Sequence, residues 1–382
     1  MPELQWKSVG IETRTYEGVE AIIADLTPYD NIHAIVVELR VRNTTTAAVN
    51  RTVFDAFGPI RLLREGSTAI VAGMPKDLIR VHHYRTGTFP RIVINQAANA
   101  VQSAVVPIYF GMSLSDPNFY LPTSRLKDVK LIISMPDRSG GGAFDPAQTT
   151  ADVWVLRTKG GVPGSYVGTF LVREVVNKVL TGSGILDMPL TVGPRYARIF
   201  VTYEHPTTNM SDGIGMLRLS ANAIDDFFVD ASLDRVLKGT FPMFPFRATL
   251  SGILAVAHGA TVDLPFGNIS QVLMTNAVPH DATADTLYES KVTAIAGRRL
   301  TVGVWTARWT GTNFDVATDA TAQPHYFISV HDGLPDYAVF DFISAPWSEP
   351  LRSMEFNTLT VKVEDRQAGA VVKVIPEEVV SF

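Results

Sequence analysis

Apolar and polar residues alternate along much of this chain, and this period of two is the feature that most constrains its fold. In residues 35–42 (IVVELRVR), one set of alternate positions is apolar throughout while the other is mainly charged, as expected of a strand with one buried face. Stretches rich in Gly, Asn, Asp and Pro, such as residues 137–142 (DRSGGG), supply the backbone angles of turns. The pattern predicts an all-β protein. The same period of two recurs in residues 129–135, 199–203, 300–304 and 359–363.

The length indicates more than one domain. The chain has 382 residues, more than the roughly 250–300 that one hydrophobic core usually organises, so we expect two domains with a core each. Hydrophobic residues make up 46% of the sequence, whereas charged residues make up only 19%, below the roughly 25% typical of soluble domains. Because the centres of protein interfaces are depleted of charge, this composition favours a surface that other copies of the chain partly cover.

Charge and cysteine content exclude several classes of function. The net charge is −5 and the basic residues are scattered, so direct binding to nucleic acid is not expected. Cysteine is absent, which excludes disulfides, thiolate catalysis and cysteine zinc sites. The N-terminal sequence MPELQWK has neither the basic nor the apolar region of a signal peptide, and we expect synthesis and folding in the cytoplasm.

Two segments of the first half recur in the second half. Residues 58–62 (GPIRL) match residues 215–219 (GMLRL), which lie 157 positions later. Residues 126–138 (LKDVKLIISMPDR) match residues 356–366 (FNTLTVKVEDR), with their alternating apolar positions offset by 230. A repeat of this kind predicts two similar β-domains. The larger second offset implies that the second half carries about seventy extra residues, which we expect as long loops at about 277–346.

Helical patterns are few. Pro75 and Ser232 are favoured helix-opening residues, and each is expected to begin a short helical turn after the first repeated strand of its half. Between the halves, apolar residues in 172–180 are spaced i, i+3, i+4, with a threonine before them and a glycine after them. This spacing predicts a connector helix over residues 168–184.

No set of residues has the spacing of a catalytic or nucleotide-binding motif. The nearest glycine-flanked serine, Ser183, follows the predicted connector helix, where a C-cap turn explains its glycines. The adjacent His82 and His83 would diverge by about 100° on a helix and so could not both face one metal ion. We therefore predict no catalytic, cofactor-binding or metal-binding residues, and no enzymatic activity.

Two segments that combine histidine with aspartate are the nearest approach to an ion site. They contain oxygen ligands of the kind that calcium prefers, but they lack the dense alternating acids of a dedicated calcium loop. Solvated turns are therefore the expected structure. The residues concerned are His280, Asp281, Asp285, His331, Asp332 and Asp336, with Asp315 and Asp319 between the two segments.

Four aromatic residues in the second half are compatible with a sugar-binding platform. Trp305 and Trp309, with Phe314 and Tyr326, could stack on pyranose rings, although core or subunit contacts are the commoner role of such residues. They keep a carbohydrate-binding or glycan-active protein open as an alternative function.

A succession of features in residues 58–90 is similar to that of a known family. A strand leads to Arg-Glu-Gly, then to Ala-Gly, to the helical turn of residues 75–84 and to Gly-Thr-Phe-Pro. In residues 121–135, Leu-Pro leads through Arg-Leu-Lys-Asp-Val into a strand, and Asn-Thr-Thr at 43–45 follows the first long strand. In these features the chain resembles the double jelly-roll major capsid proteins of tailless icosahedral viruses, including tectivirus- and corticovirus-like phages. The resemblance covers roughly residues 31–380.

This resemblance implies a domain organisation. Its fold is two tandem eight-stranded antiparallel jelly-roll sandwiches, here joined by the short connector helix. The long loops of the second half would form an outward tower. The domains expected are an N-terminal arm (1–18), a first jelly roll (19–167), the connector helix (168–184) and a second jelly roll (185–382).

The resemblance also implies a function and partners. Three copies would form a homotrimer with a pseudo-hexameric outline, and trimers would meet side by side in the shell of a virion. Other capsid proteins, such as penton or minor proteins, and an inner membrane are further expected partners. A virion spike protein is a second alternative function.

Overall fold

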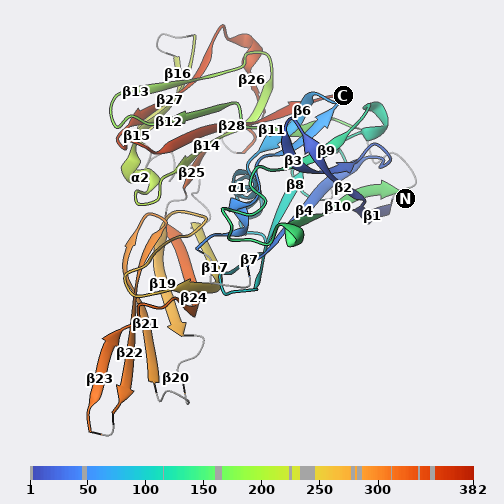
Figure 1. Cartoon of the computed structure of the whole chain (residues 1–382). Helices are drawn as coiled ribbons and strands as arrows, with labels where there is room; N and C mark the ends of the chain where they lie inside the picture. Colours follow the sequence, from blue (N-terminus) through green and yellow to red (C-terminus); the bar gives the residue numbers. More distant parts are fainter. Residues whose placement is uncertain are drawn as a thin grey trace.

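The computed structural model is built almost entirely of β-strands, which confirms the predicted all-β class (Figure 1). They form two β-sandwiches and a projecting module that we call the tower, and each of these three parts has its own buried apolar cluster. The predicted number of cores, two, is therefore too small. The structure describes residues 3–44, 50–114, 116–159, 166–222, 226–232, 246–276, 280–281, 286–310, 312–333, 336–344 and 349–382.

The first sandwich contains ten described strands and the longer helix. One sheet has the order β1-β10-β4-β8-β7 and the other has the order β2-β3-β9-β5-β6. The elements are β1 (Glu3–Val9), β2 (Ile11–Tyr16), β3 (Val19–Asp25), β4 (Ile32–Arg42), β5 (Ile60–Arg64), β6 (Thr68–Gly73), α1 (Pro75–Thr86), β7 (Ile92–Asn95), β8 (Val101–Tyr109), β9 (Lys130–Met135) and β10 (Thr150–Lys159), with single 3-10 turns at Val53–Asp55, Thr123–Arg125 and Pro146–Gln148.

The second sandwich is interrupted in sequence by the tower. Its sheets contain β28-β14-β25, with β11, β12 and β26 alongside, and β13-β27-β15-β16. The elements are β11 (Thr169–Arg173), β12 (Val176–Val179), β13 (Ile185–Leu190), β14 (Arg195–Glu204), α2 (Met210–Gly213), β15 (Ile214–Ala221), β16 (Asp226–Ser232), β25 (Tyr337–Asp341), β26 (Leu351–Arg352), a 3-10 turn at Ser353–Glu355, β27 (Leu359–Asp365) and β28 (Val371–Val380).

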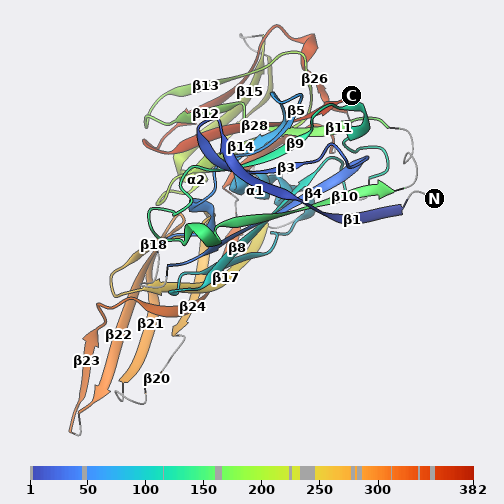
Figure 2. The same cartoon turned by 45° about the vertical axis from the view of Figure 1, so that its right-hand side comes forward.

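The tower consists of long hairpins that extend away from both sandwiches (Figures 1 and 2). The second half was expected to carry its extra residues as loops at about 277–346, but the insertion starts earlier and most of its described residues form strands. Residues 277–279, 282–285, 311, 334–335 and 345–346 of that range lie outside the described residues. The strands are β17 (Phe246–Val256), β18 (Thr261–Asp263), β19 (Ile269–Asn276), β20 (His280–Asp281), β21 (Thr286–Ala296), β22 (Arg299–Trp309), β23 (Phe314–Thr318) and β24 (Gln323–Gly333).

The internal repeat is confirmed by the strand order. The GPIRL and GMLRL segments lie at β5 and β15, and the second pair of matching segments forms β9 and β27. In the first sandwich β9 pairs with β3 and β5, and in the second β27 pairs with β13 and β15. The order β10-β4-β8 likewise corresponds to β28-β14-β25. Equivalent sequence segments therefore occupy equivalent places in two sandwiches of the same topology.

The predicted N-terminal arm is wrong for residues 3–16. These residues form β1, which pairs with β10, and β2, which pairs with β3, so they extend both sheets of the first sandwich. The two-residue turn between β2 and β3 explains the second pairing. Glu17 and Gly18 both have positive φ, 50° and 80°, as a tight hairpin turn requires.

The predicted connector helix over residues 168–184 is also wrong. The segment forms β11 and β12, both antiparallel to β28. Its apolar residues are mainly valines, which are β-branched and pack well on a sheet, and tertiary pairing overrides the helical spacing. The turn expected to open at Ser232 falls on residues 233–245, outside the described residues.

Parallel strand pairs join the three parts. β11 pairs with β6, which merges sheets of the two sandwiches into one of eleven strands. β7 pairs with β17, which merges the other sheet of the first sandwich with the tower into one of eight. At the second junction, a Cβ on Gly252 would lie 2.2 Å from the carbonyl oxygen of Ile94, so only glycine allows this approach.

Replacing Gly252 with alanine tests this junction. The added methyl group must displace backbone, so we expect the G252A variant to lose about 1–3 kcal/mol of unfolding free energy in urea denaturation. Gly10 is a matched control, because a Cβ there meets nothing within 4 Å. Equal stability of the G252A and G10A variants would contradict the close approach.

Candidate functional site: the charged junction around helix α1

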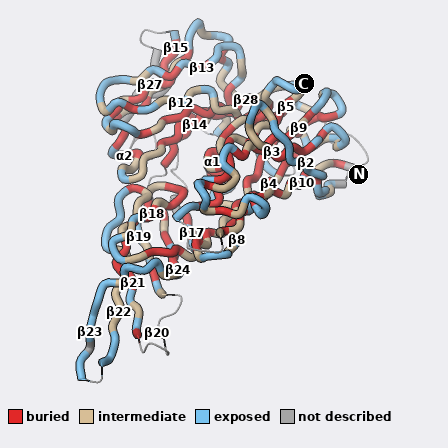
Figure 3. The backbone as a smooth tube through the Cα atoms, viewed as in Figure 1, coloured by how far each residue is buried: buried red, intermediate tan, exposed pale blue. Residues whose placement is uncertain are grey.

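Helix α1 lies where the two sandwiches and the tower meet (Figures 1 and 3). It was predicted from Pro75, which occupies the first turn, and it ends at Gly87, whose φ of 72° is the left-handed conformation typical of a helix C-terminus. The helical turn expected over residues 75–84 is thus confirmed and continues to Thr86. Most of its middle residues are buried, including charged and imidazole side chains.

Arg80 is the centre of the first charge cluster. Its side chain is only 2% exposed, and its guanidinium pairs with Asp77 on the same helix at 2.6 Å and with Glu204 of β14 at 3.0 Å. It also binds both carboxylate oxygens of Asp336, just before β25, at 2.7 and 3.3 Å. Lys373 of β28 completes the cluster by binding Asp77 at 2.9 Å. One helix of the first sandwich therefore pairs with three segments of the second.

The pKa values in this cluster favour the charged forms. Burial alone would lower the pKa of Arg80, but Asp336, Glu204 and Asp77 together raise it well above its ordinary value. Burial alone would raise the pKa of Glu204, but the charges of Arg80, Lys76 and Lys373 lower it to about 2. Arg80 and Glu204 are thus both charged at neutral pH.

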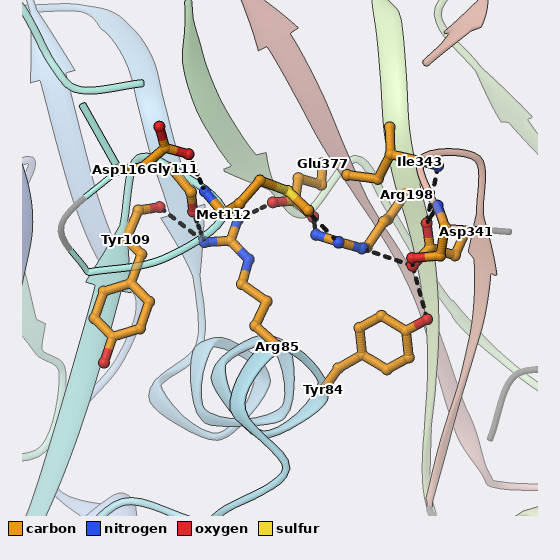
Figure 4. Close-up of polar contacts among 11 residues, drawn as sticks. Tyr84, Arg85, Tyr109, Gly111, Met112, Asp116, Arg198, Asp341, Ile343 and Glu377 are labelled. Carbon is orange, nitrogen blue, oxygen red and sulfur yellow. Dashed lines mark hydrogen bonds and ion pairs between the residues drawn. The ribbon is translucent and has the colours of Figure 1, made fainter. Parts of the chain in front are cut away.

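A second cluster lies one turn further along α1 (Figure 4). Glu377 of β28 accepts hydrogen bonds from both Arg85 of α1 and Arg198 of β14. Arg198 also binds Asp341 of β25 at 2.9 Å, and Tyr84 donates its hydroxyl to the same carboxylate at 2.8 Å. Burial would raise the pKa of Asp341, but the charge of Arg198 and these hydrogen bonds hold it below its ordinary value.

His82 and His83 are core residues of the same helix. His83 hydrogen-bonds the hydroxyl of Tyr337 at 2.7 Å and stacks on the ring of Phe89, while His82 packs edge-on against Tyr109. Burial lowers the pKa of each to about 4, and the nearby positive charge of Arg85 contributes for His82. The two rings therefore have separate partners.

The buried ion pairs of this junction hold the parts together. Its carboxylates form ion pairs with buried guanidinium or ammonium groups. These pairs occupy the oxygens that a general acid and base would need to turn towards a substrate. Among the described residues there is also no group of three or more His, Asp or Glu side chains that could hold a metal ion. In the same part of the chain, no helix is long and apolar enough to cross a membrane.

The residues considered for an ion site have other partners in the structure. His331 is buried and bonds the carbonyl of Gly267, whereas Asp336 pairs with Arg80. The side chains of His280, Asp281 and Asp332 and the whole of Asp285 lie outside the described residues. Asp319 follows β23 and caps its own turn at Thr321.

Among the four aromatic residues, the two tryptophans and Tyr326 lie on different sheets. Trp305 and Trp309 lie on β22, whereas Tyr326 lies on β24 of a different sheet. The Trp305 ring is covered by His258 edge-on and by the ammonium of Lys291. Phe314 belongs to β23, but its side chain lies outside the described residues.

The fold is similar to solved viral capsid proteins over the full length of the chain. The similarity to the STIV MCP, from Sulfolobus turreted icosahedral virus, has a TM-score of 0.59 at 11% identity and covers 100% of this chain and 98% of that chain. The major capsid protein P2 of bacteriophage PM2 gives 0.50 at 10% identity, covering 99% and 98%. VP54 of PBCV-1, fitted into a reconstruction of the virophage Sputnik, gives 0.52 at 10% identity, covering 99% and 94%.

These similarities define the class of fold. The chain has the double jelly-roll fold of viral major capsid proteins, so the resemblance found in the sequence is confirmed at the level of the fold. No protein-family model matches the chain. A comparison with curated protein sequences likewise finds no match.

Replacing Glu377 tests the second charge cluster. In the E377Q variant, two buried guanidinium groups face a neutral amide, and breaking a buried pair in this way costs about 3–5 kcal/mol of unfolding free energy. The matched control is E349Q, because Glu349 pairs with Arg352 on the exposed surface and should change stability by less than about 1 kcal/mol. Similar urea midpoints for the two variants would show that the cluster does not stabilise the junction.

The low pKa values of the two buried histidines predict that the folded protein loses stability in acid. Their folded-state pKa of about 4 lies below the ordinary 6.5, so the unfolded chain binds protons that the folded chain does not. Each histidine should therefore lower the unfolding free energy by up to about 3 kcal/mol as pH falls from 6.5 to 4. Urea denaturation across this pH range should show the loss of unfolding free energy. In the H83Q variant, the unfolding free energy should fall less steeply with pH than in the wild type. An unchanged slope in that variant would exclude His83 as a source.

Proposed function

We propose that this chain is a major capsid protein, a structural subunit without enzymatic activity that assembles into the shell of an icosahedral virion. The observation that carries this proposal is the duplicated sandwich, with the same strand order in both halves and full-length similarity to capsid proteins. The buried charges support a structural role, because they hold modules together instead of facing a cleft.

The proposed unit of assembly is a homotrimer. Two sandwiches of one topology lie side by side in each copy, so three copies around an axis present six similar units and a pseudo-hexameric outline. Such trimers would tile a shell by lateral contacts. Penton or minor capsid proteins and an underlying membrane are the further partners expected in a virion of this kind.

The outer face of the eight-stranded sheet is the surface best suited to the trimer contact. Cross-strand partners share a face, and the pairs Trp154–Val36, Ile253–Tyr326 and Ile328–Leu273 place apolar side chains on this one. Trp154 is 42% exposed, Tyr326 53% and Leu273 61%. The face runs from β1 across β10, β4, β8 and β7 to β17, β24 and β19 (Figure 1). Exposed Trp and Tyr side chains on a broad surface are typical of interface centres.

Placing a charge on this face tests the proposed contact. The wild-type chain should give a mass three times the 41.7 kDa of one copy in light scattering, with hexagonal particles in negative stain. We expect the W154E and I328E variants to shift the mass towards one copy, because a carboxylate would be buried without a partner. T13E on β2, an exposed position in the other sheet, is the control and should leave the trimer intact.

One result would contradict the proposed function, and another would contradict only the proposed contact. A wild-type chain that stays monomeric at high concentration would argue against a capsid subunit altogether. Trimers that persist in both the W154E and I328E variants would leave the capsid function in place but move the contact to another face.

A further inference from the structure

A polar cavity of about 280 Å³ lies between the first sandwich and the base of the tower. The first sandwich contributes the segment before β5 and the first turn of α1, and the tower contributes β18 and the turn that leads into β22. The cavity is therefore lined by two parts of the chain that are far apart in sequence. Its lining includes Asn50, Arg51, Thr52, Asp55, Lys76, Gln96, Asp263, Arg298 and Arg299.

The carboxylates of this cavity already have partners. Asp263 binds Arg299 through both oxygens, at 2.7 and 2.9 Å. Asp55 accepts hydrogen bonds from the backbone and hydroxyl of Thr52, and Arg51 lies 3.8 Å from it. Within the described residues, neither acid forms an ion pair with Lys76 or Arg298.

In the part of the chain that the structure describes, two cations of the lining have donors without an acceptor. Within the described part of the chain, Lys76 makes no hydrogen bond or ion pair, and its ammonium lies 5.7 Å from the centre of the Phe54 ring. The Nε of Arg298 is buried and donates to no acceptor among the described residues. Burial lowers the pKa of Lys76, and the positive charge of Arg298 lowers it further. The carboxylates of Glu204 and Asp55 partly oppose this lowering.

The backbone holds both cations in place. Lys76 follows Pro75 in the first turn of a twelve-residue helix, whose N-terminal end carries partial positive charge. Arg298 donates its backbone N–H to Pro206, and the preceding Gly297 packs so closely on residues 206–208 that a Cβ would lie 2.9 Å from their backbone. Among the described residues, four cationic side chains and two carboxylates thus line the cavity.

We propose that this cavity binds an oxyanion of the phosphate class between Lys76 and Arg298. A phosphate group supplies several strong acceptors, and charge-assisted hydrogen bonds to ammonium and guanidinium groups would satisfy the donors that the chain leaves open. The bound anion would link α1 of the first sandwich to the β21–β22 turn of the tower. This site is independent of the proposed capsid function.

The test is titration calorimetry of the whole purified chain with inorganic phosphate, against sodium chloride at equal ionic strength. We expect saturable binding with one site per chain and a higher midpoint of thermal unfolding in phosphate. The K76M and R298M variants should each bind at least about tenfold more weakly, because each loses a charge-assisted contact. The matched control is R308M, which removes an exposed arginine of β22 outside the cavity and should bind as the wild type does.

A charge-retaining variant, K76R, covers the case in which K76M fails to fold, and it should keep the affinity within a few-fold. Absence of saturable phosphate binding to the folded wild-type chain would overturn the proposal. Unchanged affinity in both K76M and R298M would also overturn it, because binding would then occur elsewhere. Light scattering on the same samples reports assembly independently, so a loss of phosphate binding can be told apart from a failure to form the trimer.

Discussion

The burial of Arg80 imposes the strongest constraint on this structure. A guanidinium removed from water is very costly unless acidic groups surround it, and here those acids come from α1, from the end of β14 and from the segment before β25. The second sandwich must therefore close against α1 for the charge of Arg80 to be buried with its partners. Glu377, shared by Arg85 and Arg198, places the same requirement on β28.

The apolar packing around α1 depends on that closure. Phe89 and Phe54 of the first sandwich both contact Phe266 of the tower, and the core cluster of the first sandwich includes Phe200 and Tyr337 from the second. Because aromatic contacts are less directional than ion pairs, they fill the junction without specifying a unique relative position. The charged groups are better suited to specify it, since each pair has a defined geometry.

Local sequence patterns predicted the strands and α1, but not the junction. The repeated segments at β5 and β15, and at β9 and β27, were found because alternation is a property of neighbouring residues. Pro75 and Gly87 similarly mark α1 from within its own sequence. The partners of Arg80 and Asp77, by contrast, are up to 296 positions away, and no short-range pattern relates Lys373 to Asp77. The prediction of a connector helix was wrong for a related reason, because pairing with the distant β28 decides the conformation of residues 169–179.

The parallel pairing of β6 with β11 has a mechanical consequence. The two sandwiches share one continuous eleven-stranded sheet, so a load applied across the subunit passes through main-chain hydrogen bonds as well as through side-chain contacts. The two sandwiches should then move as one stiff plate, with bending confined to the edges of the plate. Curvature in any assembly of such plates would arise at the boundaries between subunits and not inside them.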